Sequence, residues 1–535
     1  MNRKQNSATR AAGAGREMPN FIIFLTDQQR ADYLGCYGHP VLRTPNIDAI
    51  SRRGTRFQRC YVAAPACMPN RASLMTGRMP SVHGVRMNGI PLSQKEMTFV
   101  ESLRTSGYRT ALIGKSHLQN MIDVPPFVKS KQAPASRPDG AGGGNAGDYG
   151  QELPGRWRQN APPSLSLPYY GFEHVDLCTG HGDLVGGHYY HWLRTQIADP
   201  DAMRGPAHGL AHNYTCPQAW RTAIPEELYP TSYIGDRSIE FLNDPLRQER
   251  PFLLLVSFPD PHHPFTPPGR YWDMYNPADM VLDRSFRQNA NLLPQVAWAR
   301  AERRRNPDTP NGYGAFAVDE RECREAMALT CGMVGMIDDT VGRIMKSVVE
   351  RGLDSNTVVI FTSDHGDLLG DHGLILKGPV HFQSLIRVPL IWSDPYLNDS
   401  PSVSAALSCT IDIPASILER AAIGSYNGMQ GRSFLPALQG RSMREWTLIE
   451  EDTQEAQFGL SEASRLRTLI SDQYRLTLCD NSPSGELFNL LEDPDESRNL
   501  WNEAKYQGVK ADLLEAIARA QMDVADRSSM PIYLA

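Results

Sequence analysis

The chain has 535 residues, and its 41% hydrophobic content is enough for a large core. Its net charge of −6 and isoelectric point near 6.2 argue against a general affinity for nucleic acid or for anionic membranes. No uninterrupted apolar segment approaches the length of a membrane span. The nine cysteines, scattered from Cys36 to Cys479 without close pairs, do not indicate a disulfide framework or a zinc site.

Residues 1–18 are polar and basic, and they lack the apolar region of a secretory signal. We interpret them as a disordered leader and expect a cytoplasmic protein. The scattered cysteines fit that compartment.

An apolar run at residues 21–26 stops at Asp27 and Gln28, and a second run near residue 360 stops at Asp364 and His365. Both patterns are typical of buried parallel strands, and ligands gather at the carboxyl ends of such strands. We therefore expect the four side chains to form one divalent metal site. Oxygen donors with one imidazole favour Ca²⁺, with Mg²⁺, Mn²⁺ or Zn²⁺ as alternatives. Taken singly, an Asp after a strand is more often a turn former or a helix cap.

Residues 67–78, Cys-Met-Pro-Asn-Arg-Ala-Ser-Leu-Met-Thr-Gly-Arg, predict a short helix that begins at a cysteine. Pro69 suits the first turn, and Gly77 suits the left-handed position that ends a helix. Cys67 would lie at the positive end of that helix beside Arg71, where an anionic group and an anionic substrate are favoured. The alternative is a buried structural cysteine followed by an ordinary helix.

This segment resembles the activation sequence of the formylglycine-dependent (type I) sulfatase family of the alkaline-phosphatase superfamily, which has the form Cys-x-Pro-x-Arg followed by Thr-Gly-Arg or Thr-Gly-Lys. In that family a formylglycine-generating enzyme oxidises the cysteine, and the hydrate of the aldehyde is the nucleophile. The resemblance implies a formylglycine at Cys67, which would also be a metal ligand, and an orienting role for Arg71. The family most often has Ser where this chain has Asn70.

The next elements extend the resemblance. Asn88 occupies a place where relatives bind the transferred group, although Asn-Gly is also a turn signal. Residues 107–117 predict a strand that runs into a turn and are similar to the second sulfatase motif, Gly-Lys followed closely by His, which assigns roles to Lys115 and His117. The family usually has an aromatic residue where Ser116 stands.

The composition between residues 133 and 163 turns to Gly, Pro, Asn and Ala, which predicts a flexible insertion. The region that follows carries six histidines, and their irregular spacing favours polar loops over a second metal site. These histidines are His174, His181, His188, His191, His208 and His212.

A buried strand at residues 253–258 leads into Pro-His-His-Pro-Phe, where relatives carry a histidine that protonates the leaving oxygen. The register selects His262, with His263 as the alternative. Apolar residues at helical spacing predict a helix over residues 319–351. Lys377, twelve residues after His365, falls where the family has a second lysine that binds the transferred group.

Alternating strands and helices up to about residue 440 predict a catalytic domain, 19–440, with a mostly parallel or mixed sheet covered on both faces, as in the alkaline-phosphatase fold. Short strands at 446–451, 464–471 and 474–479 and a helix near 504–525 predict a smaller antiparallel sheet-and-helix subdomain, 441–535, which sulfatases also carry. The apolar last residues leave a homo-oligomer open.

The resemblance implies hydrolysis of a small anionic sulfate ester through a covalent sulfo-enzyme intermediate, and the charge and hydropathy of the chain lead us to expect no nucleic acid or membrane as partner. Lys115, Lys377 and Asn88 would offset charge on the sulfuryl group, His262 would protonate the leaving oxygen, and His117 would act as the base that restores the aldehyde.

Two alternatives remain at this point. Phosphonate monoesters and phosphodiesters present a similar tetrahedral anion, and phosphonate monoester hydrolases share the Gln28 and His365 pattern with various sulfatases. The other alternative, from a different class, is a catalytically silent binding protein that keeps the fold.

Overall fold

The computed structural model describes residues 18–124, 147–159, 161–245, 250–288, 291–307, 314–397, 401–441 and 443–531. Only Met18 of the predicted leader is among them, and residues 133–146 and 160 of the predicted insertion lie outside them. Within this part of the chain, the strands form one large sheet, one four-stranded sheet and one two-stranded sheet.

The large sheet is built around buried apolar strands. Its five central strands, β8, β1, β6, β3 and β4, are parallel, whereas β10 runs antiparallel to both of its neighbours. The tenth strand, β12, pairs with β2 outside the main order. The strands in sheet order are β11 (Ser402–Ser404), β2 (Thr55–Tyr61), β10 (Arg387–Ser393), β8 (Thr357–Ser363), β1 (Asn20–Thr26), β6 (Phe252–Ser257), β3 (Arg109–Lys115), β4 (His174–Thr179) and β5 (Gly186–Gly187), with β12 at Ser408–Cys409.

The two apolar runs that end in polar residues are direct neighbours in this sheet. Thr26, the last residue of β1, is in register with Ser363, the last residue of β8. The predicted parallel strands are thus confirmed, and the residues that follow them start at the same edge of the sheet. The mostly parallel sheet also confirms the predicted α/β fold class.

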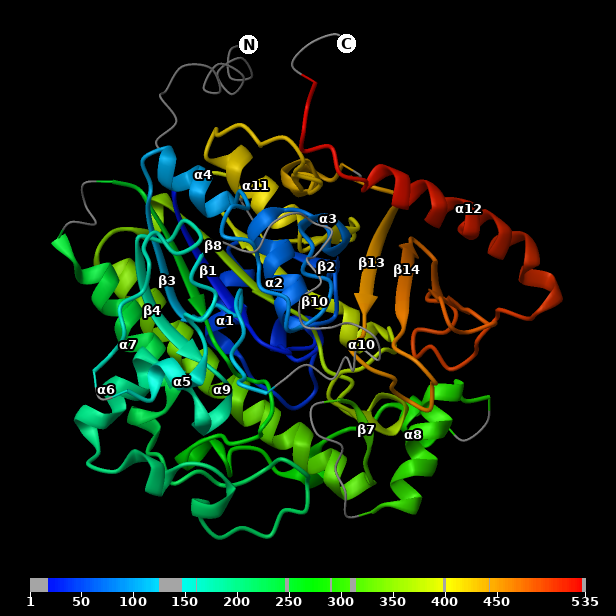
Figure 1. Cartoon of the computed structure of the whole chain (residues 1–535), viewed down its shortest axis with the longest axis horizontal. Helices are drawn as coiled ribbons and strands as arrows, with labels where there is room; N and C mark the ends of the chain where they lie inside the picture. The colour runs from blue at the N-terminus through cyan, green and yellow to red at the C-terminus, as the bar shows by residue number, and fades with distance from the viewer. Residues whose placement is uncertain are drawn as a thin grey trace, which may run out of the picture.

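Helices cover both faces of the large sheet (Figure 1). Because side chains alternate along a strand, Ile23 of β1 packs into the core on one face, and Ile22 and Phe24 pack into the core on the other. The first core includes α2 (Cys67–Thr76), α4 (Phe99–Thr105) and α11 (Asp412–Arg420), and the second includes α1 (Pro45–Ser51), α6 (His188–Gln196), α7 (Pro230–Asn243) and α9 (Glu320–Glu350).

The longest helix, α9, begins with a capping box, in which the Asp319 carboxylate accepts from the Glu322 N–H and the Glu322 carboxylate accepts from the Asp319 N–H. This confirms the helix predicted from apolar spacing. The remaining elements are short or peripheral: α3 (Pro80–His83), α5 (Pro154–Trp157), α8 (Pro294–Arg305), α10 (Gln383–Ile386), β7 (Phe316–Ala317) and β9 (Leu374–Ile375).

The C-terminal sheet is antiparallel, as predicted, and lies to one side of the main sheet (Figure 1). Leu448 and Leu476 on one of its faces pack with helix α12, whereas Ile449 and Ile470 on the opposite face join the core of the large sheet. The small sheet therefore shares a core with the catalytic part. Its elements are β13 (Trp446–Asp452), β14 (Arg465–Ser471), β15 (Tyr474–Cys479), β16 (Glu486–Asn489) and α12 (Gln507–Asp523).

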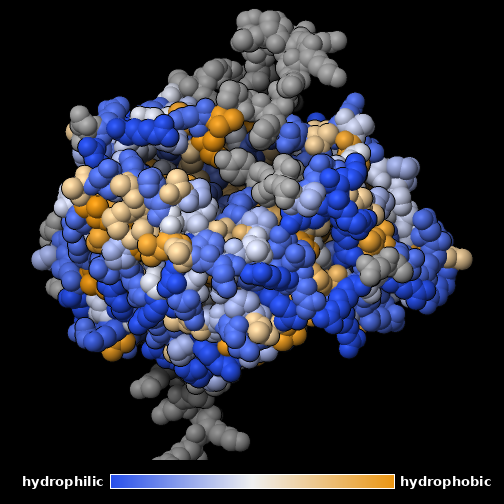
Figure 2. Space-filling model, turned by 90° about the horizontal axis from the view of Figure 1, so that it is seen from below, coloured by the Kyte–Doolittle hydropathy of each residue, from blue (hydrophilic) through white to orange (hydrophobic). Residues whose placement is uncertain are grey.

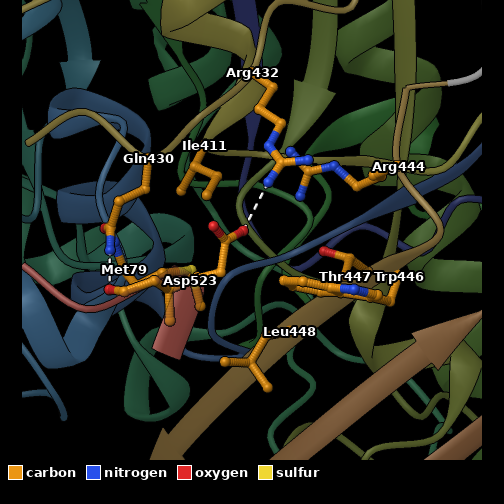
Figure 3. A pocket seen from close by; sticks show the side chains of 10 residues that line it. Met79, Ile411, Gln430, Arg432, Arg444, Trp446, Thr447, Leu448 and Asp523 are labelled. Atoms are coloured by element: carbon orange, nitrogen blue, oxygen red, sulfur yellow. Dashed lines mark hydrogen bonds and ion pairs between the residues drawn. The ribbon is translucent and has the colours of Figure 1, made fainter. Parts of the chain in front are cut away.

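A cavity lies where the end of α12 meets the rest of the chain (Figure 3). Arg432 and Asp523 form an ion pair of 2.7 Å at its rim, and Trp446 forms part of its wall. Its volume of about 20 Å³ is enough for a water molecule and too small for an organic substrate. We therefore treat it as a packing feature of the subdomain contact.

One face of the surface, seen in Figure 2, is mostly hydrophilic, and its apolar residues lie singly or in small groups. Scattered exposed apolar side chains are ordinary on protein surfaces and indicate no docking site. The homo-oligomer therefore stays a prediction. Among the described residues, no helix has both the length and the apolar character needed to cross a membrane.

Candidate active site

The site forms where β1 and β8 end and α2 begins. Asp27 follows β1 directly, and its backbone N–H donates to the carbonyl of Asp260, 3.2 Å away. Asp364 follows β8, and its carboxylate accepts from the backbone N–H of Gln28 at 3.0 Å. Cys67 is the first residue of α2, which ends at Gly77 in the left-handed conformation, as predicted. Three segments that are far apart in sequence thus deliver polar groups to one buried point.

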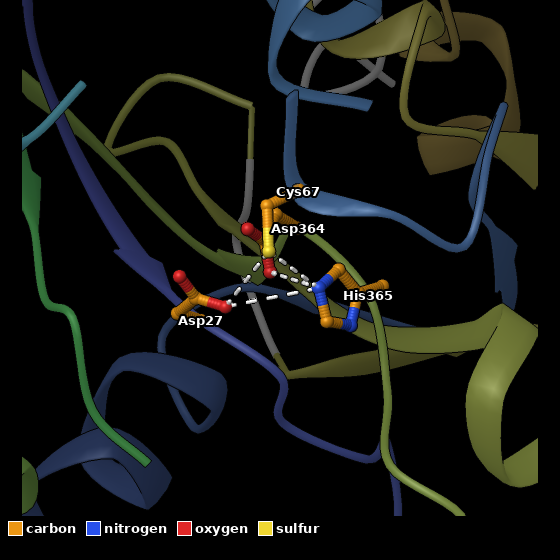
Figure 4. Close-up of side chains that lie close together, drawn as sticks. All are labelled: Asp27, Cys67, Asp364 and His365. Carbon is orange, nitrogen blue, oxygen red and sulfur yellow. Dashed lines mark hydrogen bonds and ion pairs between the residues drawn. The ribbon is translucent and has the colours of Figure 1, made fainter. Parts of the chain in front are cut away.

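Four side chains converge there: Asp27, Cys67, Asp364 and His365 (Figure 4). The Cys67 Sγ lies 3.1 Å from His365 Nε2 and 3.6 Å from Asp27 Oδ1. His365 Nε2 lies 3.7 Å from an oxygen of each aspartate. Ligand atoms that bind one Ca²⁺ at 2.3–2.6 Å and at right angles are about 3.3–3.7 Å apart. The spacing of these atoms therefore suits a single cation.

The orientations of the His365 ring and of the Gln28 side chain also fit a metal ion. His365 Nδ1 pairs with the Gly366 carbonyl at 2.9 Å, so the Nε2 lone pair is directed into the group. Gln28 Nε2 lies 2.5 Å from Asp367 Oδ2 and 3.2 Å from His263 Nδ1, so its Oε1 faces the site, where it accepts from Lys377. The donors are hard oxygens plus one imidazole. A thiol matches this set less well than the hydroxyls of an aldehyde hydrate at position 67.

The orientation of Gln28 leads to a prediction about Asp367. An asparagine at position 367 would turn its own NH₂ group toward the Gln28 amide nitrogen. The Gln28 amide would then flip, so that its nitrogen instead of its oxygen faces the metal. We expect Asp367→Asn to weaken binding of Ca²⁺ about 10–100-fold, as measured by calorimetric titration of the metal-free protein. Unchanged affinity, with the fold intact by circular dichroism, would show that Gln28 is not oriented in this way.

Arg71 links the two buried aspartates. Its side chain is only 2% exposed, and it donates to Asp364 at 2.7 Å and to Asp27 at 3.4 Å. It also donates to the Lys115 carbonyl and to Ser257 Oγ, both at 3.0 Å. A buried guanidinium with this many partners is held in one position. Arg71 thus fixes both carboxylates, and its role in orienting residue 67 stays a prediction.

Asn70 joins the start of α2 to neighbouring segments. Its side-chain oxygen accepts from the Ala63 N–H at 2.9 Å and from the Thr410 hydroxyl at 2.8 Å, and its amide nitrogen donates to the Asp364 carbonyl. The side chain is fully buried. The residue that departs from the most frequent sulfatase motif therefore positions Cys67 relative to β8.

Two lysines bring positive charge to the group. Lys115 Nζ pairs with Asp27 and lies 2.7 Å from His181 Nε2. Lys377 Nζ lies 3.2 Å from Cys67 Sγ and 2.8 Å from His262 Nε2.

The lysines also lower the pKa of the Cys67 thiol. Burial and Asp27 act to raise the pKa of Cys67, but Lys377, Lys115 and His365 outweigh them, so this pKa lies below its usual value. The position therefore favours an anion.

The two histidines after β6 both face the site. His262 Nδ1 contacts the His263 carbonyl, which leaves Nε2 to contact Lys377. His263 contacts Gln28 instead. The choice of His262 as the acid stays a prediction, and His263 lies beside Gln28, a predicted metal ligand.

The two predicted site residues that remain are His117 and Asn88. His117 is buried, and its Nδ1 has no hydrogen-bond partner among the described residues. The pKa of His117 lies well below its usual value, chiefly because of burial and then because of Lys115. The Asn88 side-chain oxygen accepts from the Met68 N–H at 3.1 Å, so this side chain also braces the first turn of α2.

Sequence reasoning missed His181. This residue comes shortly after β4, and its ring stacks on that of His262 with a centroid distance of 3.7 Å. Ligand atoms of Asp27, His181 and His262 also lie within 4.8 Å of one another, close enough that they could share a metal ion. The signal was its position after a parallel strand, but its place among six irregularly spaced histidines hid it.

Two family models match the chain. The model described as sulfatase matches residues 19–132 and 178–423, which is more than half of the sequence. The chain belongs to the sulfatase family. A second model, described as the C-terminal part of N-sulphoglucosamine sulphohydrolase, matches residues 370–523 of this sulfatase. The membership suggested by residues 67–78 is thus confirmed, together with the alkaline-phosphatase superfamily to which the family belongs.

Individual relatives cover nearly the whole sulfatase chain. The arylsulfatase of Clostridium perfringens is 25% identical over 91% of this chain and 91% of its own length. The multifunctional alkaline phosphatase superfamily protein PehA of Trinickia caryophylli is 26% identical over 95% and 96%. The solved structure of the phosphonate monoester hydrolase of Agrobacterium radiobacter has a TM-score of 0.74 at 22% identity and covers 95% of this chain and 96% of that one. The last comparison supports the fold.

Proposed function

We propose that this sulfatase hydrolyses small sulfate monoesters, with formylglycine at position 67 as the nucleophile and one divalent metal ion. The observation that carries the proposal is the position of Cys67, which begins a helix, contacts the metal-ligand group and lies 3.2 Å from Lys377 Nζ. Membership in the sulfatase family supports it. The formylglycine-generating enzyme is the maturation partner that the proposal requires.

Asp27, Gln28, Asp364 and His365 would hold the metal ion, together with residue 67. When bound, the ion supplies a Lewis acid that polarises the ester oxygens and lowers the pKa of a hydroxyl on residue 67. Carboxylate and amide oxygens dominate this set, which favours Ca²⁺ over Zn²⁺.

The other residues would act on charge and protons. Lys115 and Lys377 would offset the negative charge on the sulfuryl oxygens, where low dielectric strengthens each ion pair. His262 would deliver to the leaving oxygen a proton that its Nε2 takes from the Lys377 ammonium, 2.8 Å away, while its Nδ1–H stays bonded to the His263 carbonyl. His117 would accept a proton from the hydroxyl of residue 67 when the aldehyde is restored. Its buried ring and lowered pKa keep it neutral and able to do so.

Matched aryl esters test the reaction class. If the proposal is right, kcat/KM is higher for 4-nitrophenyl sulfate than for 4-nitrophenyl phenylphosphonate. The two substrates share a leaving group, so a difference in kcat/KM reports on the group that is transferred. The reverse order would favour the second candidate, a phosphonate monoester hydrolase. Enzymes of that class share the Gln28 and His365 pattern with various sulfatases. Turnover of neither ester by protein that carries the aldehyde would favour the silent binding protein.

A further inference from the structure

The loop after β3 has a strained backbone at a residue of the proposed mechanism. His117 has φ = 55°, in the left-handed region that non-glycine residues seldom adopt. Its ring nitrogen Nδ1 has no hydrogen-bond partner among the described residues, so the ring itself does not fix the loop through that atom. Contacts from elsewhere must therefore hold this conformation.

Those contacts come from Glu152. Three consecutive backbone N–H groups converge on its carboxylate: His117 donates to Oε2 at 2.9 Å, and Leu118 and Gln119 donate to Oε1 at 3.0 and 2.9 Å. The Tyr169 hydroxyl donates a fourth bond at 2.6 Å. Successive N–H groups that point to one place form a nest, an arrangement that binds anions. In this nest the anion is a side chain of the same protein.

Burying a carboxylate costs free energy unless hydrogen bonds or a cation compensate for its lost hydration. Glu152 is 0% exposed, and none of the ion pairs found in the described part of the chain includes it. Burial raises the pKa of Glu152, while the bonds from Tyr169 and the backbone oppose that effect. Within the described part of the chain, the carboxylate is compensated by hydrogen bonds and not by an ion pair, and three of those bonds come from the nest.

The segment that carries Glu152 is itself fastened to the same loop. The Gln151 N–H donates to the Gln119 side-chain oxygen at 2.9 Å, and Gln119 Nε2 donates to the Asp148 carbonyl at 3.0 Å. The Trp157 ring donates to the Gln151 carbonyl at 2.8 Å. The two segments are thus bound reciprocally, and Glu152 is placed by more than its own charge.

We propose that Glu152 is a positioning residue that holds His117 in its strained conformation and so aims the imidazole at the reacting group. This inference rests on the proposed function in one respect, the role of His117 as the base that restores the aldehyde. Glu152 itself touches neither substrate nor metal ligand. A loss of about 1 Å in the placement of a catalytic group costs up to about 100-fold in rate.

Glu152→Gln is the sharpest variant, because an amide can keep the bonds to Oε1 while its NH₂ group faces the His117 N–H. We expect kcat for 4-nitrophenyl sulfate to fall about 10–100-fold with little change in kcat/KM, since the base acts after the leaving group has departed. In a His117→Ala background, the same substitution should change kcat by less than about twofold. Gln151→Ala, in the same segment, is the control that keeps the nest.

Backbone exchange gives a readout that does not depend on activity. Hydrogen–deuterium exchange of a peptide spanning residues 116–121 should become about tenfold faster in Glu152→Gln and not in Gln151→Ala. Unchanged exchange would overturn the holding role. An equal fall of kcat with and without His117 would overturn positioning and show a general structural effect. Full kcat in His117→Ala would remove the base and the positioning claim together, while sulfate ester hydrolysis through residue 67 would stand on its own test.

Discussion

Cys67→Ala is expected to reduce sulfate ester hydrolysis by about a thousand-fold or more, because alanine cannot be oxidised to the aldehyde and leaves no nucleophile at the start of α2. The measurement pairs kcat for 4-nitrophenyl sulfate with mass spectrometry of the peptide that spans residues 60–78. Protein made aerobically with the formylglycine-generating enzyme should show the aldehyde mass at position 67, and the variant should not.

Cys409→Ala is a matched control for this substitution. Cys409 is also fully buried, but it lies at the end of β12 against the C-terminal core. Both substitutions remove one buried sulfur, so a similar small loss of stability is expected from each. Activity that survives in Cys67→Ala, or an unmodified thiol in active wild-type protein, would rule out the formylglycine mechanism.

Local sequence was sufficient for the parts of the site that directly follow regular elements. The apolar runs before Asp27 and Asp364 define strands that are buried on both faces, and parallel pairing then places their ends together. Pro69 and Gly77 similarly define the ends of a helix whose first residue is Cys67. In each case, the physical cause of the position lies within a few residues of the functional side chain.

Local sequence could not predict the contacts that orient these side chains. Glu152 lies 35 residues from His117, within a stretch whose Gly and Pro content predicted a flexible insertion. Asp367 orients Gln28 across 339 positions of sequence. Such pairs depend on how loops pack after the sheet has formed, and no periodicity records them. The position of His181 after a strand was a weak signal among six irregularly spaced histidines, and its stacking on His262 arises only in the folded protein.

Asp364→Asn is expected to have the second largest effect, because it removes a proposed metal ligand and breaks a buried ion pair at once. Asp364 pairs with Arg71 at 2.7 Å, and both side chains are almost completely buried. Loss of one partner of a buried pair costs about 3–5 kcal/mol of unfolding free energy. Loss of a charged ligand should weaken Ca²⁺ binding by at least about 100-fold, more than a change in a residue that only orients a ligand.

Asp412→Asn separates these two effects. Asp412 is buried like Asp364, it accepts from the Arg432 N–H at 2.8 Å, and it pairs with Arg444 outside the site. Both variants should therefore unfold at lower urea concentration, but only Asp364→Asn should lose Ca²⁺ in calorimetric titration and lose turnover while still folded. If Asp412→Asn lost metal and activity to the same extent, the effect of Asp364 would be one of stability alone. If Asp364→Asn bound Ca²⁺ normally, the ligand set built on β1 and β8 would be wrong.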